Sequence, residues 1–251
     1  MVYFVGAGPG DKELITVKGS KLLSNADSVI YAGSLVNKEL LDYTKEDCKL
    51  HDSAHMTLEE VIGTIKSNEE NGYMTVRLHT GDPSLYGAIR EQIDLLAQGG
   101  IGFEVVPGVS SFLGAAASMG VEYTLPGISQ TVILTRMEGR TPVPETEQIE
   151  LLAKAQASMV IFLSAGMLKE LSEKLMEGGY PKDTPAAIVC KATWADEKIV
   201  RTTVGGLAES AGDIKKTALV LVGGFLGDSY GRSMLYHPEF THGYRQGRTD
   251  E

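Results

Sequence analysis

The sequence is poor in cysteine, in basic charge and in long apolar runs. Its 251 residues include two cysteines, Cys48 and Cys190, which are far apart and form no CxxC pair. This spacing argues against a disulfide framework or a zinc knuckle and fits a reducing compartment. No apolar run approaches about 18 residues, so we expect no membrane span. The first ten residues lack the basic stretch of a signal peptide, and we therefore expect a cytoplasmic protein.

Basic residues are outnumbered by acidic ones, 23 to 33, which gives a net charge of −10. Nucleic-acid binding is disfavoured, because phosphate contacts need clustered Lys and Arg. A ligand rich in carboxylates stays compatible with this balance, because a local basic pocket can lie within an acidic molecule. The chain also lacks low-complexity tracts, so broad disorder is not expected.

Common catalytic and metal-binding motifs are absent as well. The five histidines show no HExxH or other ligand spacing, so we predict no metal site. No GxSxG nucleophile elbow is present. Candidates for handling a proton are His51, Asp52, His55, Glu59 and His79, and a solvated or capping role is the alternative for each. The sequence therefore predicts no particular catalytic residue.

Hydrophobic residues (43%) and 29 glycines are plentiful, and the first half alternates apolar strands with helical segments. Thr57 to Glu60 (TLEE) match a capping box at the start of one helix. The alternation with short links predicts an α/β fold with a mostly parallel sheet. The predicted strands are 2–6, 28–33, 74–82 and 103–108, and the predicted helices are 14–24, 35–42, 57–70, 84–98 and 110–120.

A cluster of Gly and Pro at 119–127 predicts a linker, so we expect domains over 1–118 and 119–228. Residues 191–205 are more typical of an antiparallel hairpin than of a crossover. The polar, aromatic tail at 229–251 is expected to form an arm on the surface or in a subunit interface. The second half has predicted strands near 130–135, 158–164, 185–191, 198–204 and 217–223, and helices near 145–156, 166–178 and 204–212.

The first strand runs into a glycine-rich turn, VGAGPGD. A dinucleotide fingerprint needs a third glycine where Asp11 stands, and an acidic residue where the second strand ends in Tyr31-Ala32. A Walker A loop is also excluded, because Lys12 lacks the preceding Gly and is followed by Glu13. The turn therefore predicts that the backbone comes close to a ligand but does not bind a pyrophosphate. A tight turn without a ligand is the alternative.

Two further turns follow strands, TGDPSLYG at 80–87 and PGVSS at 107–111. Ligands of open α/β sheets bind outside the carboxyl ends of strands, so both turns are candidate ligand sites. The alternatives are local: Asp82 as a helix N-cap with Pro83 at the first helical position, and capping by Ser110 and Ser111. A fourth turn, LSAG at 163–166, says little by itself.

The turns VGAGPGD, TGDPSLYG and PGVSS, in this order and spacing, resemble those of the class III S-adenosylmethionine-dependent tetrapyrrole methylases. The resemblance covers nearly the whole chain. Uroporphyrinogen-type members usually carry Asp shortly after the tyrosine of the second strand, where this sequence has Ala32-Gly33. Four other stretches resemble the subfamily that methylates carbon 11 of precorrin-4 or cobalt-precorrin-4. They are IYAGSLV (30–36), SAHMTLEE (53–60), TRMEGRTPVPE (135–145) and SMLYHPEFTHGYR (233–245).

The resemblance implies two α/β domains with a cofactor cleft between them, a homodimer, and S-adenosylmethionine as the methyl donor, with S-adenosylhomocysteine as product. A tetrapyrrole (precorrin) substrate carries many carboxylates, so basic residues should bind it. Arg77, Arg136 and Arg140 are the expected substrate contacts, with surface solvation as the alternative for Arg136 and Arg140. The expected cofactor contacts are Pro9, Thr80, Gly81, Asp82, Leu85, Ser110, Ser111, Ser164, Ala192 and Ala218.

The chemistry implied by the resemblance suits a chain without a catalytic triad. A sulfonium methyl is already activated, so the enzyme mainly has to align methyl and carbon and exclude water. Other hypotheses remain: methylation of another tetrapyrrole position, a nucleotide-dependent oxidoreductase, or a sensor that binds S-adenosylmethionine without turnover. An RNA methyltransferase is disfavoured by the acidic charge.

Overall fold

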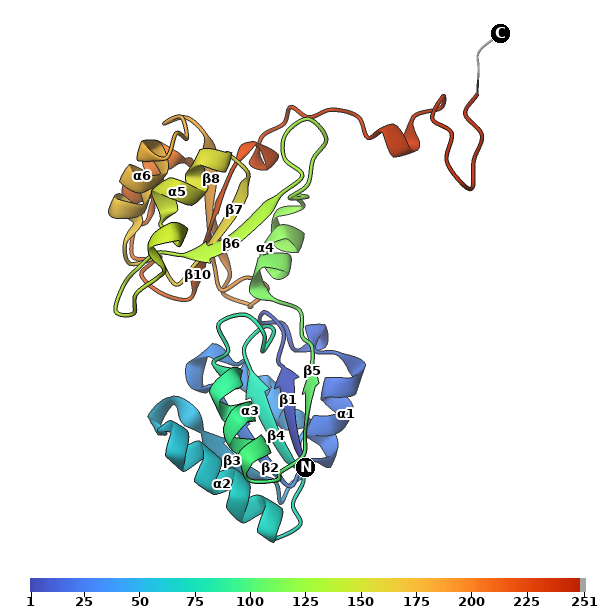
Figure 1. Cartoon of the computed structure of the whole chain (residues 1–251), viewed down its shortest axis with the longest axis vertical. Coiled ribbons are helices and arrows are strands. Elements are labelled where there is room, and N and C mark those ends of the chain that lie inside the picture. The colour runs from blue at the N-terminus through green and yellow to red at the C-terminus, as the bar shows by residue number, and fades with distance from the viewer. Residues whose placement is uncertain (249–251) are drawn as a thin grey trace. The chain divides into compact units, whose positions relative to one another are not determined.

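The computed structural model describes residues 1–248 and divides the chain into two compact units (Figure 1). Unit 1 consists of Met1–Ser118 together with Lys191–Glu197, and unit 2 contains Met119–Cys190 and the chain from Lys198 onward. The two units divide after Ser118, and the loop at 191–197 groups with unit 1. The expected tail at 229–251 groups with unit 2, and its last three residues lie outside the described part.

Unit 1 is built on a five-stranded sheet in which every pair of neighbours is parallel. The strand order is β3-β2-β4-β1-β5. The carboxyl ends of all five strands therefore lie at one edge of the sheet. The strands are β1 (Val2–Gly6), β2 (Ser28–Tyr31), β3 (Lys49–Asp52), β4 (Thr75–His79) and β5 (Phe103–Val106).

Helices cover both faces of this sheet, as expected for parallel strands. Leu23 and Leu40 pack against Val5 on the face of α1 and η3, whereas Ile65 and Leu96 join the α2 and α3 side of the sheet. The α-helices are α1 (Val17–Asn25), α2 (Leu58–Glu70), α3 (Ile89–Gln98) and α4 (Ser111–Met119). The 3-10 segments are η1 (Lys12–Leu14), η2 (Gly33–Leu35), η3 (Lys38–Tyr43) and η4 (Ser53–His55).

The predicted capping box is confirmed: the Thr57 hydroxyl accepts from the Glu60 N–H, and the Glu60 carboxylate accepts from the Thr57 N–H at 2.7 Å. The predicted helix at 84–98 is partly wrong, because α3 begins only at Ile89. Residues 82–88 form an irregular turn in which Tyr86 and Ala88 have positive φ. Asp82 is therefore no helix N-cap, and the capping alternative for this residue is wrong. The predicted helix at 35–42 is replaced by η2 and η3.

Unit 2 has a mixed sheet in the order β6-β7-β10-β8-β9. Only β6 and β7 are parallel, and β8 with β9 forms the antiparallel hairpin expected over 191–205. The strands are β6 (Val132–Arg136), β7 (Ser158–Phe162), β8 (Pro185–Cys190), β9 (Lys198–Thr203) and β10 (Ala218–Val222).

The helices of unit 2 are short apart from α6, and they pack on one face of the sheet around Leu171 and Leu175. They are α5 (Ile149–Leu152), α6 (Leu168–Glu177) and α7 (Leu207–Ser210), with 3-10 segments η5 (Glu145–Glu147), η6 (Ala153–Ala155), η7 (Val204–Gly206), η8 (Gly224–Leu226) and η9 (Met234–Tyr236). No helix in the described part of the chain is long and apolar enough to cross a bilayer.

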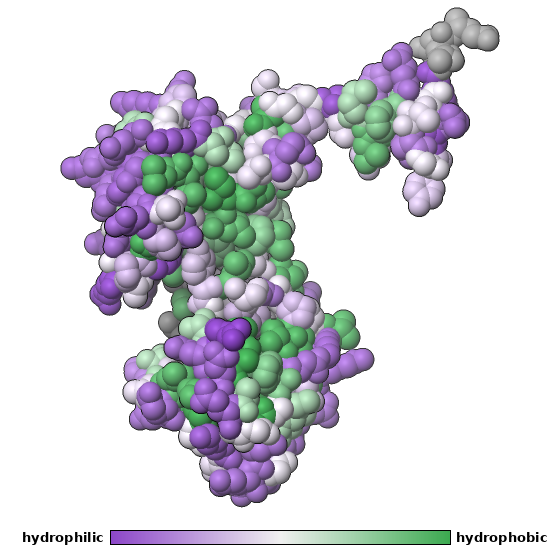
Figure 2. Space-filling view, viewed as in Figure 1, coloured by the Kyte–Doolittle hydropathy of each residue, from purple (hydrophilic) through white to green (hydrophobic). Residues whose placement is uncertain are grey.

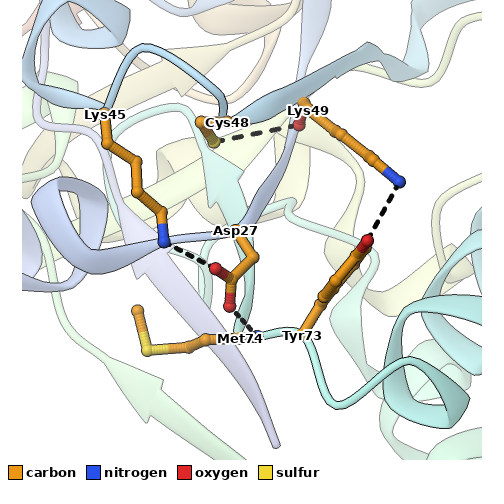
Figure 3. A network of polar contacts seen from close by, with 6 residues as sticks. All are labelled: Asp27, Lys45, Cys48, Lys49, Tyr73 and Met74. Atoms are coloured by element: carbon orange, nitrogen blue, oxygen red, sulfur yellow. Dashed lines mark hydrogen bonds and ion pairs between the residues drawn. The ribbon is translucent and has the colours of Figure 1, made fainter.

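The amino edge of the unit 1 sheet is held by surface ion pairs and hydrogen bonds (Figure 3). The Asp27 carboxylate accepts from the Lys45 ammonium and from the Met74 N–H, at 2.7 Å for the latter. The Lys49 ammonium lies over the Tyr73 ring, 4.6 Å from its centroid. The exposed side chains at this edge thus pair with one another, whereas the Ser28 hydroxyl at the start of β2 is buried without a hydrogen-bond partner among the described residues.

Candidate functional site

Three turns meet at the carboxyl edge of the unit 1 sheet, at residues 6–11 after β1, 80–87 after β4 and 107–111 after β5. The first two are joined through the backbone: the Gly8 N–H donates to the Gly81 carbonyl at 3.3 Å, and the Gly81 N–H returns a bond to Gly8 at 2.9 Å. The Ala7 N–H donates to the His79 carbonyl at 2.7 Å. The first and second predicted turns therefore form one structural element.

Glycines let the third turn come equally close. A Cβ on Gly6 would lie 2.5 Å from the Gly108 Cα and 2.6 Å from the Gly81 carbonyl oxygen. Real Cβ atoms are not found at such distances from backbone atoms, so only glycine fits. Three backbone segments thus converge more closely than side chains would allow, and their peptide groups can face a ligand directly.

The Asp82 carboxylate connects the second turn to the third. It accepts from the Gly108 N–H at 2.8 Å, from the Ser84 N–H at 2.8 Å, and from the Ser84 hydroxyl. Burial by itself would raise the pKa of this carboxyl, but the bonds from Ser84 and Gly108 outweigh burial and hold the pKa below its usual value. Asp82 therefore stays ionised at neutral pH and acts as a clamp between turns.

One buried polar side chain in these turns lacks a partner, and other predicted positions lie close to it. The Thr80 hydroxyl is buried and has no hydrogen-bond partner among the described residues. A buried hydroxyl without a partner costs free energy, so a ligand that pairs with it would be favoured. Ser110 is buried next to Gly81, Ser111 opens α4, and Leu85 lies half-buried in the irregular turn. The structure thus brings together the predicted positions of the second and third turns.

The charge of the three turns is unusual for a nucleotide site. They contain two acidic residues, Asp11 and Asp82, and no Lys or Arg. A pyrophosphate would find no cation here, whereas a zwitterionic or positively charged ligand would meet no repulsion. The electrostatics therefore agree with the sequence-based exclusion of a dinucleotide site.

The loop Lys191–Glu197, part of unit 1, also reaches the first turn. The Trp194 indole N–H donates to the Pro9 carbonyl at 3.0 Å. This loop carries Ala192, which is buried and whose carbonyl lies beside Gly10. Two predicted cofactor positions from distant parts of the sequence, Pro9 and Ala192, thus belong to one cluster. Sequence reasoning missed Trp194, although a lone tryptophan within a hairpin loop was a signal worth following.

The other two predicted cofactor positions lie in unit 2. The Ser164 hydroxyl is fully buried, donates to the Phe162 carbonyl at 2.7 Å and accepts from the Met137 N–H at 2.9 Å. Its side chain therefore organises the turn after β7. Ala218 begins β10 opposite Cys190. Contacts of Ser164 and Ala218 with a cofactor stay predictions.

Arg77 occupies the interior of unit 1, which does not favour the predicted substrate contact. Its guanidinium donates to the Ile30 carbonyl at 3.1 Å and to the Gln92 side chain at 3.3 Å. Burial lowers its pKa to about 10. We therefore interpret Arg77 as a structural residue between β4 and α3 and leave it out of the proposed substrate contacts.

Arg136 and Arg140 flank the loop that follows β6 and differ in their contacts. The guanidinium of Arg136 is hydrogen-bonded to backbone carbonyls of the loop, whereas that of Arg140 is exposed. Arg136 donates to the carbonyls of Met137 and Thr141 at 3.1 Å and of Pro142 at 2.6 Å, so it shapes the loop. Arg140 is exposed and makes no ion pair with any residue that the structure describes. Of the three predicted arginines, Arg140 is the one whose guanidinium could bind a carboxylate without breaking existing bonds.

The histidines offer no obvious acid–base pair. His79 is 4% exposed, stacks on Phe4 with ring centroids 5.9 Å apart, and has an unpartnered Nε2. Burial, assisted by the charge of Arg77, lowers its pKa to about 3, so the ring is neutral at pH 7. Burial and Lys49 also lower the pKa of His51. Within residues 1–248 no group of three His, Cys, Asp or Glu side chains is placed to hold a metal ion.

A parallel α/β sheet whose carboxyl-edge turns converge without a cluster of cations is typical of a protein that binds a small polar ligand at this edge. Comparison with known proteins identifies the family. Residues 1–208 match the Tetrapyrrole (Corrin/Porphyrin) Methylases, and the chain belongs to that family. The resemblance seen in the three turns is thereby confirmed, and the protein is a methyltransferase.

Individual relatives agree with this assignment. The cobalt-precorrin-4 C(11)-methyltransferase of Methanocaldococcus jannaschii is 53% identical over 248 residues, covering 98% of this chain and 96% of that protein. The X-ray structure of the cobalamin biosynthetic enzyme CbiF, a cobalt precorrin-4 methyltransferase, is 48% identical, with a TM-score of 0.88 over 90% of this chain and 96% of that one. A uroporphyrin-III C-methyltransferase from Thermus thermophilus, complexed with S-adenosylhomocysteine, is 26% identical, with a TM-score of 0.76 over 90% and 98% of the two chains.

Proposed function

We propose that this protein transfers a methyl group from S-adenosylmethionine to carbon 11 of cobalt-precorrin-4 during cobalamin biosynthesis. The 53% identity over nearly the full length of the archaeal cobalt-precorrin-4 C(11)-methyltransferase carries the choice of substrate. The departure at Ala32-Gly33 from the uroporphyrinogen-type pattern supports it. Methylation of another corrin position by the same fold is the alternative.

The residues of unit 1 are compatible with the cofactor. The Thr80 hydroxyl is buried without a partner, and glycines let the three turns converge with no side chain between them. S-adenosylmethionine offers an amino acid group, ribose hydroxyls and an adenine to such groups, and its sulfonium is compatible with turns that lack Lys and Arg. We expect Pro9, Gly81, Leu85, Ser110, Ser111 and Ala192 to contact it, with Asp82 holding the second and third turns together.

When bound, the cofactor supplies a methyl group that is already activated by the positive sulfur. The protein then has to orient the two reactants and exclude water, and neither task requires a catalytic triad. The turns position the donor through backbone groups that are fixed by Gly8, Gly81 and Asp82. Burial and the charge of Arg77 lower the pKa of His79 to about 3, so its ring is neutral at neutral pH.

Calorimetric titration with S-adenosylhomocysteine, with NAD as the control, tests the cofactor assignment. We expect binding of the former and none of the latter, whereas binding of NAD alone would favour the oxidoreductase hypothesis. Incubation with cobalt-precorrin-4 and with precorrin-4 then tests the substrate. Mass spectrometry should show the gain of one methyl group and NMR should place it on carbon 11, and a methyl group at another ring position would support the alternative.

We further propose that the protein works as a homodimer in the cytoplasm. The tail from 229 onward exposes Tyr230, Met234, Leu235 and Tyr236, and hydrophobic surface is visible on it in Figure 2. Exposed apolar side chains in a segment held by its own hydrogen bonds are typical of an interface. The proposed location follows from the sequence, in which two distant cysteines are typical of a reducing compartment. Light scattering of the purified protein would measure the dimer directly.

A further inference from the structure

Two hydrogen bonds from the loop Lys191–Glu197 hold the first turn on both sides of Gly10. The Trp194 indole N–H donates to the Pro9 carbonyl at 3.0 Å, and the Asp11 N–H donates to the Thr193 hydroxyl at 3.0 Å. One bond fixes the peptide group before Gly10 and the other fixes the peptide group after it. The orientation of this turn is therefore determined by side chains that come from almost two hundred residues later in the chain.

Close packing accompanies these bonds. A Cβ on Gly10 would overlap the Trp194 ring and lie 2.8 Å from the Ala192 carbonyl oxygen. On the other side of the turn, a Cβ on Gly114 in α4 would lie 2.8 Å from the Pro9 Cβ and 3.2 Å from the Thr193 methyl group. The turn is thus enclosed between the loop and α4, with glycine at both points of contact.

The loop adopts a costly backbone conformation to place these side chains. Lys191 and Thr193 have positive φ, 52° and 67°, which is unfavourable for residues with a Cβ and worst for a β-branched one. The Glu197 carboxylate compensates by accepting from the Thr193 N–H at 2.6 Å and from the Ser118 hydroxyl at 2.6 Å. Such strain persists only where surrounding contacts determine the conformation, and it is concentrated at functional sites.

We propose that Trp194 is a positioning residue for the cofactor site: its indole N–H holds the Pro9 carbonyl and so orients the glycine-rich turn against Gly81. Thr193 has the same role for the peptide group of Asp11. This inference rests on the proposed function, in which the first turn contacts S-adenosylmethionine. Neither side chain is required to touch the cofactor, because both act through the backbone of residues 9–11.

The variant Trp194→Phe tests the proposal, because it keeps an aromatic ring and removes the donor. We expect the Kd for S-adenosylhomocysteine and the KM for S-adenosylmethionine to rise about three- to tenfold, the usual effect of one neutral hydrogen bond, with kcat at saturation changed less than twofold. Tyr180→Phe is the matched control, since it removes the bond from the Tyr180 hydroxyl to the Ala157 carbonyl in unit 2. It should lower the melting temperature and leave the Kd unchanged.

Thr193 offers a second, independent comparison. Thr193→Val removes the hydroxyl that accepts from Asp11 and should raise the Kd, whereas Thr193→Ser keeps an acceptor and should restore it. Should Trp194→Phe fail to fold, this pair carries the same test. Unchanged Kd values, within twofold, in Trp194→Phe or in Thr193→Val would overturn the proposal.

Amide hydrogen exchange separates this inference from the proposed function. In the free protein, the exchange of the Asp11 amide should accelerate in Trp194→Phe and in Thr193→Val, and remain as in the wild type in Tyr180→Phe. If the wild type fails to bind S-adenosylhomocysteine, the proposed function is wrong, yet faster exchange would still show that the loop holds the turn. If exchange is unaffected, the positioning role is wrong even where the wild type binds the cofactor.

Discussion

The two edges of the unit 1 sheet are built from the same five strands but differ in how closely the backbone segments at each edge approach one another. At the amino edge, Asp27, Lys45 and the Met74 N–H pair with one another at the surface (Figure 3). At the carboxyl edge, the Thr80 hydroxyl is buried without a partner, and glycines bring three backbones together. A buried hydroxyl without a partner is present at both edges, because Ser28 at the start of β2 is another, but the demanding backbone, in which glycines let three turns converge, lies at the edge to which we assign the ligand.

The largest expected effect that would sharpen this comparison comes from Gly108→Ala. The new Cβ would overlap the Gly81 carbonyl oxygen and lie 2.7 Å from the Gly6 Cα, and backbone atoms cannot move away cheaply. We expect a loss of about 3 kcal/mol in the free energy of unfolding and at least a tenfold weaker binding of S-adenosylhomocysteine. Urea denaturation and calorimetry measure the two quantities.

Gly63→Ala is the control for that variant. Gly63 lies within α2, and a Cβ on it would meet no other atom within 4 Å, so alanine should stabilise the helix by about 0.5–1 kcal/mol and leave binding unchanged. Equal losses of stability in the two variants would contradict the distinction between the convergent turns and the rest of unit 1.

His79 should make the stability of the carboxyl edge depend on pH. Its folded pKa of about 3 lies below the unfolded value of about 6.5, so the unfolded chain binds a proton that the folded chain does not. The stabilisation is complete above pH 6.5 and is lost as the pH falls from there toward 3, by about 1.4 kcal/mol per pH unit. In His79→Phe the slope of the unfolding free energy between pH 6.5 and 4.5 should decrease accordingly.

Urea denaturation of the wild type and of His79→Phe at several pH values measures this slope. An unaltered slope in His79→Phe would mean that the buried ring is protonated in the folded state, which is contrary to its surroundings.

Asp82→Ala distinguishes a clamp between turns from a local turn residue. It removes the acceptor for the Gly108 N–H and should weaken binding of S-adenosylhomocysteine about tenfold or more, because the third turn loses its connection to the second. The melting temperature should fall further with the ligand present than without it. Equal shifts in the two conditions would indicate that Asp82 supports the fold alone.

Arg140→Ala should affect the substrate and not the cofactor. Its exposed guanidinium is expected to bind a carboxylate of the precorrin, so its removal should raise the substrate KM about threefold while the Kd for S-adenosylhomocysteine stays the same. Steady-state kinetics with the tetrapyrrole varied measure the effect. Arg136→Ala, in contrast, should disturb the loop itself and lower the melting temperature.

The smallest effect is expected at the amino edge. Lys45→Met removes an exposed partner of Asp27, and such pairs contribute little in water. We expect a small fall in melting temperature and no change in cofactor binding or turnover. A loss of binding comparable to that of Asp82→Ala would break the comparison between the two edges.

Local sequence signals predicted most strands and the capping box at Thr57, because periodicity and capping act over a few residues. They missed β3, since KLHD is short and partly exposed and carries no apolar run. They also extended α3 back to residue 84, because Asp82 followed by Pro83 has the composition of a helix start while its carboxylate binds Gly108 instead. That competing partner is 26 residues away and is invisible to any local pattern.

The candidate site was likewise predictable where local sequence signals mark it, and it was missed where it depends on partners far apart in the sequence. The three turns were found because each is marked by glycine and follows a strand, and the family resemblance supplied their order. Arg77 was chosen for its charge, and nothing local indicated that its guanidinium would be enclosed by Ile30 and Gln92. Trp194 was missed because its partner, Pro9, is 185 residues away in sequence.

The grouping of Lys191–Glu197 with Met1–Ser118 has a consequence for the order in which the protein can be completed during synthesis. All five strands of the first sheet leave the ribosome early. The glycine-rich turn can form its hydrogen bonds with Thr193 and Trp194 only after the loop up to residue 197 has emerged. A fragment cut after Ser118 would contain all five strands but would lack the loop that forms hydrogen bonds with the first turn. Designs that exchange or fuse the N-terminal half of this enzyme should transplant the loop together with it.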